Sequence, residues 1–402
     1  MFLIFLIVFI DLMGFGIVIP ILPLYGERYQ PSPATFGLLV MTFSLMQFIF
    51  SPILGRLSDR FGRRPILLIS LAGTVVGYIL FAYQRSLAVL FLARIVDGIS
   101  GGNISTAQAV IADITKPEER AKGMGLVGAA FGLGFIFGPA IGGRALAFGD
   151  SGPGLFAAGL SAIAFLLTAV ALPETWPPEK RGTANHGHQP MFSIRRLIDA
   201  LHHPQIGILL VIFFLTTFAF ANFEGTFSLF LEKRLSYGPA EVANLFVYIG
   251  ILAALIQGVL VGRIVKRFGE RSLIVSGLIL LIPGFLGLIA ISSGRQLMAL
   301  LPALALGTGL VNPSLSSLVS RLSAEHEQGG ILGVYQSMAS LGRIAGPFWG
   351  VYSLESHGIA FPYMTAALVT ALAACMALAV LFRWHSAGRP ADVPAAGDGE
   401  SR

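Results

Sequence analysis

Long apolar segments, separated by short polar connectors, occupy nearly the whole chain. A helix needs roughly 20 apolar residues to cross the hydrocarbon core of a bilayer, and runs of that length recur. They predict twelve membrane-spanning helices, six on each side of one longer polar segment: 2–24, 34–56, 65–84, 86–112, 121–146, 152–173, 206–231, 240–263, 271–292, 296–322, 328–353 and 360–383. We therefore expect an all-α membrane protein.

The polar segment in the middle divides the chain into two units. It is rich in proline, carries two basic pairs and includes "FSIRRLIDALHH", which predicts a short amphipathic helix on the membrane surface. The expected organisation is a six-helix bundle over 1–173, a cytoplasmic linker over 174–205, a second six-helix bundle over 206–385 and a disordered cytoplasmic tail over 386–402.

Composition and charge agree with this pattern. Hydrophobic residues make up 55% of the chain and charged residues 12%, against about 25% charged in a typical soluble domain. The net charge of +6 comes from basic residues in short connectors, which argues against nucleic-acid binding. Lysine and arginine number nineteen on the side of the linker and six on the other, which places both termini in the cytoplasm. The one cysteine, Cys375, excludes a disulfide framework.

Two motifs return after the midpoint of the chain. "GRLSDRFGRRP", which begins at Gly55, is echoed 207 residues later by "GRIVKRFGERS", and "GPAIGG", which begins at Gly138, is echoed 208 residues later by "GPFWGV". A shared offset at separate places indicates that the six-helix unit is duplicated in parallel. Such duplication is common in secondary transporters, which bind substrate between the halves near the middle of the membrane.

These motifs resemble those of the major facilitator superfamily, in particular its twelve-span drug:proton antiporters, and most of all the tetracycline efflux pumps. The segment "DLMGFGIVIPILP" is similar to the first-span signature, "ADITKPEERAKGMG" to the connector before the fifth span, and Arg94 in "ARIVDGISGG" to the fourth-span arginine. The chain departs from the pattern at Asp97, where glutamine is usual, and at Lys266, which replaces the aspartate in the second loop motif. The third span also lacks the acidic residue of tetracycline pumps.

The first loop motif resembles the superfamily's signature between the second and third spans. Its glycines permit a tight turn and close helix approach, and Asp59 is placed to accept from the N-terminus of a nearby helix or to pair with Arg63 or Arg120. We expect a cytoplasmic gating loop, although basic residues that only keep the loop inside would explain its arginines as well. The expected members are Gly55, Asp59, Arg60, Gly62, Arg63, Arg64, Asp113 and Arg120.

"GFIFGPAIGG" resembles the fifth-span motif of antiporters. Small residues spaced by three or four let helices approach closely, and proline bends a helix. The expectation is a tightly packed fifth span that faces the other half and limits leakage; generic helix packing is the alternative. Its residues are Gly134, Gly138, Pro139, Gly142 and Gly143.

Ionisable residues inside the predicted spans are few: Asp11, Arg94, Asp97, Glu224 and Arg343. Such groups are costly in a membrane and usually face a wet cavity or a partner. Asp11 is the best candidate for a proton carrier, with Arg94, Asp97 and Glu224 as further coupling groups. The alternatives are that Asp11 only caps a polar pocket and that Arg94 and Asp97 only neutralise each other. Glu224 could instead lie at the outer rim or bind a cationic group of the drug.

Polar uncharged residues in the spans are expected to line a substrate cavity, together with Arg343, which is suited to an anionic substrate group. They are Gln47, Asn103, Gln108, Asn222, Asn244, Gln257, Asn312 and Gln336. The sequence carries no phosphate-binding loop, so we expect transport driven by a proton gradient, with no cofactor and no metal.

The favoured hypothesis is a monomeric inner-membrane, proton-coupled exporter of amphipathic drugs that works by alternating access. A proton-coupled importer or uniporter of a small metabolite such as a sugar is the alternative, which the antiporter-like fifth-span motif disfavours. A membrane enzyme or receptor requires catalytic groups near one interface or a large extramembrane domain, and the sequence offers neither.

Overall fold

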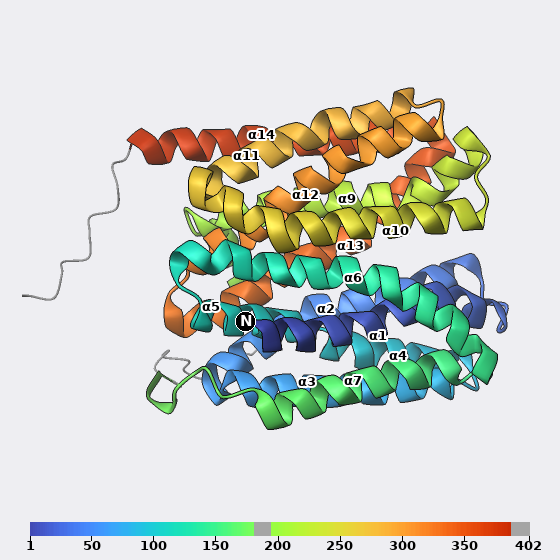
Figure 1. The fold of residues 1–402 in the computed structure, drawn as a ribbon, viewed down its shortest axis with the longest axis horizontal. Coiled ribbons are helices and arrows are strands. Elements are labelled where there is room, and N and C mark those ends of the chain that lie inside the picture. The colour runs from blue at the N-terminus through green and yellow to red at the C-terminus, as the bar shows by residue number, and fades with distance from the viewer. Residues whose placement is uncertain (181–193, 387–402) are drawn as a thin grey trace, which may run out of the picture.

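The computed structural model describes residues 1–180 and 194–386, and within these ranges every regular element is helical (Figure 1). The α-helices are α1 (Phe2–Glu27), α2 (Pro33–Phe61), α3 (Arg63–Ala82), α4 (Leu87–Ser100), α5 (Asn103–Ile114), α6 (Arg120–Ala145), α7 (Gly152–Ala171), α8 (Ile194–His202), α9 (Ile206–Leu235), α10 (Pro239–Leu255), α11 (Val261–Ala290), α12 (Gly294–Leu322), α13 (Gln328–His357) and α14 (Phe361–Ser386).

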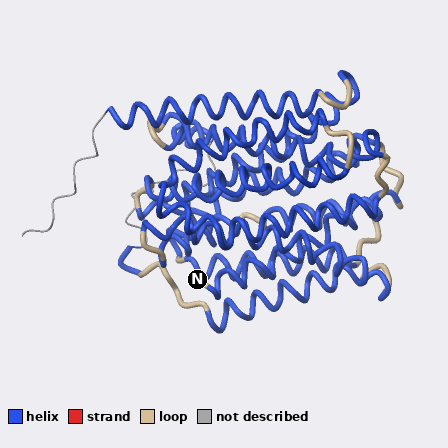
Figure 2. Tube along the Cα trace, turned by 45° about the horizontal axis from the view of Figure 1, so that its top comes forward, coloured by secondary structure: helices blue, strands red, loops and turns tan. Residues whose placement is uncertain are grey.

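Two bundles lie side by side as two layers (Figure 1). In the first, α1 packs on α6 and α7, and α3 packs on α4 and α7; in the second, α13 and α14 pack on α9, and α11 packs on α12 and α14. The bundles meet along two seams, where α2 packs against α13 and where α6 packs against α10 and α12. The loops gather at the two ends of the helices (Figure 2). We call the end that carries residues 62 and 329 the Gly62 end, and the opposite end the Asp150 end.

Within the described residues, nine helical runs are long and apolar enough to cross a membrane. One of them, Val247–Ala290, covers the greater part of the predicted spans 240–263 and 271–292. The first predicted span contains the shorter apolar stretch Phe2–Val18. The expectation of a helical membrane protein is therefore confirmed. The number of twelve spans stays a prediction.

The predicted fourth span is interrupted. It consists of α4 and α5, which are separated by Gly101 and Gly102. A Cβ atom at Gly101 would lie 2.9 Å from the Phe43 ring, and one at Gly102 would lie 2.9 Å from the Leu54 side chain. Both contacts are with α2, so the glycine pair lets that helix approach closely.

The boundary between the predicted eighth and ninth spans also differs from expectation. A π-helical turn, Ile256–Leu260, joins α10 to α11, and helical structure continues through the expected connector. The chain bends only at Gly269, whose φ is 74°. Gly62 has φ 106° at the corresponding place between α2 and α3. Other residues avoid such values, so glycine marks the equivalent bend in both repeats.

The helix expected in the linker is present as α8, which packs against α9. Its position on a membrane surface stays a prediction. Linker residues 181–193 lie outside the described residues, as do residues 387–402 of the tail for which disorder was predicted.

Candidate functional site

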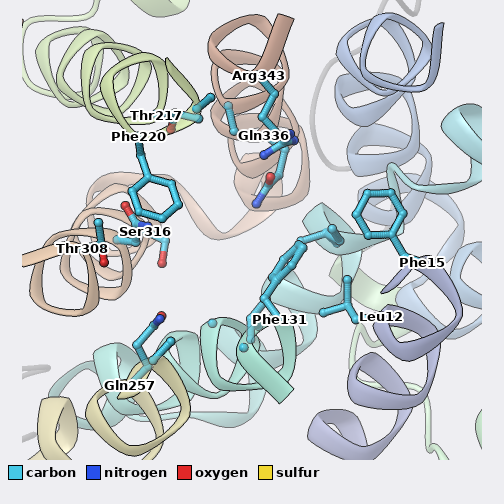
Figure 3. Close-up of a pocket in the computed structure, with 18 of the residues that line it drawn as sticks. Leu12, Phe15, Phe131, Thr217, Phe220, Gln257, Thr308, Ser316, Gln336 and Arg343 are labelled. Atoms are coloured by element: carbon cyan, nitrogen blue, oxygen red, sulfur yellow. The ribbon is translucent and has the colours of Figure 1, made fainter. Parts of the chain in front are cut away.

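A cavity of about 330 Å³ lies between the bundles and receives residues from both (Figure 3). Figure 3 shows Leu12, Phe15 and Phe131 of the first bundle opposite Thr217 and Phe220 of the second, so much of the wall is apolar or aromatic. The predicted site residues that line it are Asp11, Gln47, Asp97, Asn103, Gln108, Glu224, Gln257, Asn312, Gln336 and Arg343.

Three predicted residues are not among those that line the cavity. Arg94 lies behind the wall, where Nη1 donates to Asp97 at 3.0 Å and the guanidinium sits 4.6 Å from the Phe43 ring centre. Asn222 is buried between α9 and α14, and its amide donates to the carbonyl of Pro362 at 2.8 Å. Asn244 is exposed on α10. The last two belong to largely apolar helices, in which the sequence does not reveal which face meets the cavity.

Asp11 is held by neutral donors. Its carboxylate accepts from Asn103 Nδ2 at 3.0 Å and from Ser161 Oγ at 3.2 Å. In contrast, Arg94 and Asp97 form an ion pair with each other, because they are three residues apart on the same face of α4. The first bundle therefore presents one carboxylate without a cationic partner and one neutralised pair.

Arg343 and Glu224 are the charged residues that the second bundle contributes to the cavity wall. The Arg343 guanidinium donates through Nη2 to Gln47 Oε1 at 2.6 Å and to Ser340 Oγ at 3.2 Å. Because Gln47 belongs to α2 and in turn donates to Gly101 O at 2.8 Å, this contact joins the two bundles.

Polar contacts continue along the seam between the bundles. Ser337 Oγ donates to Phe48 O at 2.6 Å, and Gln336 Nε2 donates to Gln108 Oε1 at 3.1 Å. These bonds cross from α13 to α2 and α5. Gln47, Gln108 and Gln336, which were predicted to line the cavity, therefore also form hydrogen bonds with the opposite bundle.

The glycines of the fifth-span motif pack mostly within their own bundle. A Cβ atom at Gly134 would lie 2.9 Å from Leu12 O, and one at Gly138 would lie 2.4 Å from the backbone of Gly16. These glycines hold α6 against α1 of the same bundle rather than against the other half, and so does Gly142, which approaches Ile17. Pro139 lies within α6. A Cβ atom at Gly143 would meet nothing within 4 Å.

The residues of α6 that meet the other half lie both within the motif and before it. The Ile136 side chain of the motif approaches Gly250 of α10, where a Cβ atom would lie 2.4 Å from it. A Cβ atom at Gly125 would lie 2.7 Å from Gln257 O, and one at Gly128 would overlap the Gln257 side chain. Gln257 belongs to the π-helical turn, a feature often found at functional sites. The contact between the halves therefore extends from Gly125 into the motif and is not confined to the motif.

Asp59 at the Gly62 end joins the two bundles. Its carboxylate accepts from the backbone N–H groups of Gly329 at 2.9 Å and Gly330 at 2.7 Å, at the start of α13, and pairs with Arg63 at 2.5 Å. Two of the expected partners, a helix N-terminus and Arg63, are thus both present, while Arg120 donates instead to Ala112 O at 2.9 Å.

Arg63 is fully buried behind this contact. Its Nε donates to Asp113 at 3.0 Å, and its guanidinium lies 4.8 Å from the Trp176 ring centre. Trp176 also donates to Asp59 O at 2.9 Å, a role that the sequence did not signal because tryptophan in a linker carries no motif.

The remaining loop residues take other positions. Gly55 meets α13 so closely that a Cβ atom would lie 2.0 Å from Gly329 O. Arg60 is exposed, and Arg64 donates to the carbonyls of Thr168 and Ala169 in its own bundle.

The second repeat has a related network with reversed charges. Lys266 stands 207 residues after Asp59 and reaches across to Glu119 at 3.4 Å. Glu270, 207 residues after Arg63, is bound by Arg321 at 2.8 Å, and Arg321 stands 208 residues after Asp113. Each acidic residue of the first network is replaced by a basic one, and the arginine by a glutamate.

At the Asp150 end, Arg28 and Asp150 form an exposed ion pair at 2.6 Å within the first bundle. The hydrogen bond from Arg28 holds the pKa of Asp150 below its usual range. Among the described residues, no group of three or more His, Cys, Asp or Glu side chains is arranged to hold a metal ion.

Comparisons with known proteins agree on one family. Residues 4–347 and 209–401 match the sequence model of the Major Facilitator Superfamily. The chain is 35% identical to the class D tetracycline resistance protein of Salmonella ordonez, covering 84% of this chain and 85% of that one, and 31% identical to multidrug resistance protein 2 of Bacillus subtilis, covering 90% of each. Its fold is similar to the crystal structure of the human organic anion transporter MFSD10 (TETRAN), with a TM-score of 0.83, 27% identity and coverage of 93% and 98%.

Proposed function

This chain belongs to the Major Facilitator Superfamily and is a multi-pass membrane transporter rather than an enzyme, and on that premise we propose that it is a proton-coupled antiporter. It exports amphipathic drugs, either tetracycline-like or of several classes, by alternating access. The observation that carries the proposal is the cavity between the two bundles, whose mostly apolar wall includes four of the five ionisable residues of the predicted spans. Its relatives among tetracycline and multidrug resistance proteins support export as the direction.

Asp11 is the proposed proton carrier. Its hydrogen bonds come from neutral donors, Asn103 and Ser161, so the carboxyl group can gain or lose a proton without breaking an ion pair. Movement of Asp11 relative to the nearby Arg94 within the first bundle is the proposed switch. Proximity of arginine favours the charged carboxylate, and its withdrawal favours proton uptake.

The network around Asp59 is the proposed gate. It holds α2 against the N-terminus of α13 and keeps the Gly62 end closed, in agreement with the close approach of Gly55 to Gly329. Rocking of the bundles about the cavity then requires this contact to open. By the distribution of basic residues, the Gly62 end faces the cytoplasm. We further propose that the protein is a monomer of the inner membrane and uses no cofactor.

The test is transport in inverted membrane vesicles that contain the full chain. We expect tetracycline or ethidium to accumulate when a proton gradient is imposed, and proton release from the vesicle lumen to accompany uptake. Accumulation that ignores the gradient contradicts proton coupling. Movement of a sugar with its gradient, and of neither drug, favours the importer or uniporter instead.

A further inference from the structure

The cavity has an uneven distribution of charge. Its first-bundle wall carries Asp11 and the neutralised Asp97, whereas its second-bundle wall carries Arg343 and Glu224. Within the described ranges, no carboxylate lies within 4.0 Å of the Arg343 guanidinium. Glu224 is near enough to attract it through space but makes no hydrogen bond or ion pair with it. Arg343 is therefore the cation of the wall that has no carboxylate in direct contact.

The contacts of Arg343 leave most of its donors available. Only Nη2 is engaged, by Gln47 Oε1 and Ser340 Oγ, both of which are neutral acceptors. A guanidinium offers five N–H groups in a planar fork that suits a carboxylate or a similar anion. A charge kept inside a membrane protein without an ion-pair partner commonly marks a substrate pathway.

We infer that Arg343 binds the ionised acidic group of the substrate, so that this transporter accepts amphipathic molecules carrying such a group on an aromatic body. The inference rests on the proposed function, because it assigns substrate chemistry to the same cavity. Figure 3 shows Arg343 on one side of the cavity, with Phe220, Phe131 and Phe15 around it. These rings supply the apolar surface that the rest of the molecule needs.

The acidic residues determine the orientation of the ligand. Asp11 faces the cavity without a cationic partner among its hydrogen bonds, so an anionic group is repelled from the first bundle and attracted to α13. Glu224, on the neighbouring α9, suits a basic group on the same ligand. Zwitterions with separated acidic and basic groups therefore match this wall as well.

Binding at Arg343 also acts on the seam between the bundles. An acidic group that accepts from Nη2 competes with Gln47 of α2, which is 2.6 Å from that nitrogen. Occupancy of the site thus weakens one polar contact that joins α2 to α13. The acidic group of the ligand therefore binds at the seam between α2 and α13, which must open during transport.

The test measures equilibrium binding of 2-naphthoate and of its uncharged methyl ester to the full chain in nanodiscs, with empty nanodiscs subtracted. The two probes share an aromatic body and differ in charge. We expect the acid to bind at least tenfold more tightly than the ester. Arg343→Gln should remove this preference, and Arg343→Lys should restore part of it, since lysine keeps the charge without the fork.

Arg295→Gln is the matched control, since Arg295 is exposed at the Asp150 end and undergoes the same chemical change outside the cavity. It should keep the acid preference. A wild-type protein that binds the ester as tightly as the acid, or an Arg343→Gln protein that still prefers the acid, overturns the inference. Because binding is measured without a gradient, loss of proton-driven export with the preference intact refutes the proposed function alone.

Discussion

Asp59→Asn is the substitution that tests the gate most directly. The carboxylate accepts two backbone N–H groups of α13, from Gly329 and Gly330, and pairs with the buried Arg63. Asparagine has the same shape but only one acceptor oxygen, and its NH₂ group then faces a donor. The variant therefore loses contacts between the bundles while the steric fit is preserved.

The expected magnitude follows from the bonds that cross the seam. A hydrogen bond to a charged group contributes about 1.5–3 kcal/mol. Weakening two such bonds reduces the stability of the closed Gly62 end by about 3 kcal/mol, at the lower end of that range. Since 1.4 kcal/mol is a tenfold change, the ratio of closed to open molecules falls by about a hundredfold.

The assay is a distance measurement between spin labels at Arg60 and His326, which are exposed on opposite bundles at the Gly62 end. Cys375 is first replaced by Ala so that only the two introduced cysteines react. Pulsed electron resonance in nanodiscs should show a short distance in the parent protein and a dominant long distance in Asp59→Asn.

Asp113→Asn is the control for this experiment. It also removes a carboxylate from Arg63, at 3.0 Å, but Asp113 lies in the same bundle as that arginine and makes no bond to α13. We expect a much smaller change in the distance distribution. An equal shift in both variants, or none in Asp59→Asn, refutes the argument that the bonds to α13 keep this end closed.

Three further variants test other parts of the structure. Asp11→Asn should abolish drug accumulation driven by a proton gradient in inverted vesicles yet retain drug binding; undiminished accumulation excludes this residue from coupling. Gly138→Ala places a Cβ atom 2.4 Å from the α1 backbone and should destabilise the protein by about 1–3 kcal/mol, measured as a lower Tm, whereas Gly143→Ala, with open space around it, should not; equal Tm values contradict the packing argument. Lys266→Ala removes a half-exposed pair and should change the spin-label distances far less than the loss of the Asp59 carboxylate, since such pairs contribute about 0–1 kcal/mol; a comparable change contradicts this ranking.

The helices were predictable because a helix that crosses the hydrocarbon core of a bilayer needs about 20 apolar residues. Apolar length predicted the helices, and the repeated motifs predicted the duplication, without any knowledge of packing. Internal breaks were not predictable in the same way. Gly101 and Gly102 interrupt the fourth span because α2 lies close to them, and the bend between the eighth and ninth spans is set by the φ of Gly269. Both depend on a neighbour or a local dihedral angle.

Most of the polar residues of the cavity were predictable because polar side chains are rare in the apolar spans, but their hydrogen-bond partners were not. Charged and amide side chains in apolar helices stand out, and most of them line the cavity. Asn222 shows the limit of that reasoning, because its amide is used to join α9 to α14. The backbone donors of Gly329 and Gly330 carry no side-chain signal, so the cross-bundle partner of Asp59 emerges only when α2 and α13 are placed together.

The reversed signs of the two repeats govern how the halves recognise each other. Two copies of the first half, joined as the native halves are, would bring Asp59 opposite Glu119, and two copies of the second would bring Lys266 opposite the backbone N–H groups at the start of α13. Either self-assembly loses the attraction found in the native pair. If the halves are produced as separate chains, they should therefore assemble as a one-to-one heterodimer, even though related motifs occur in both.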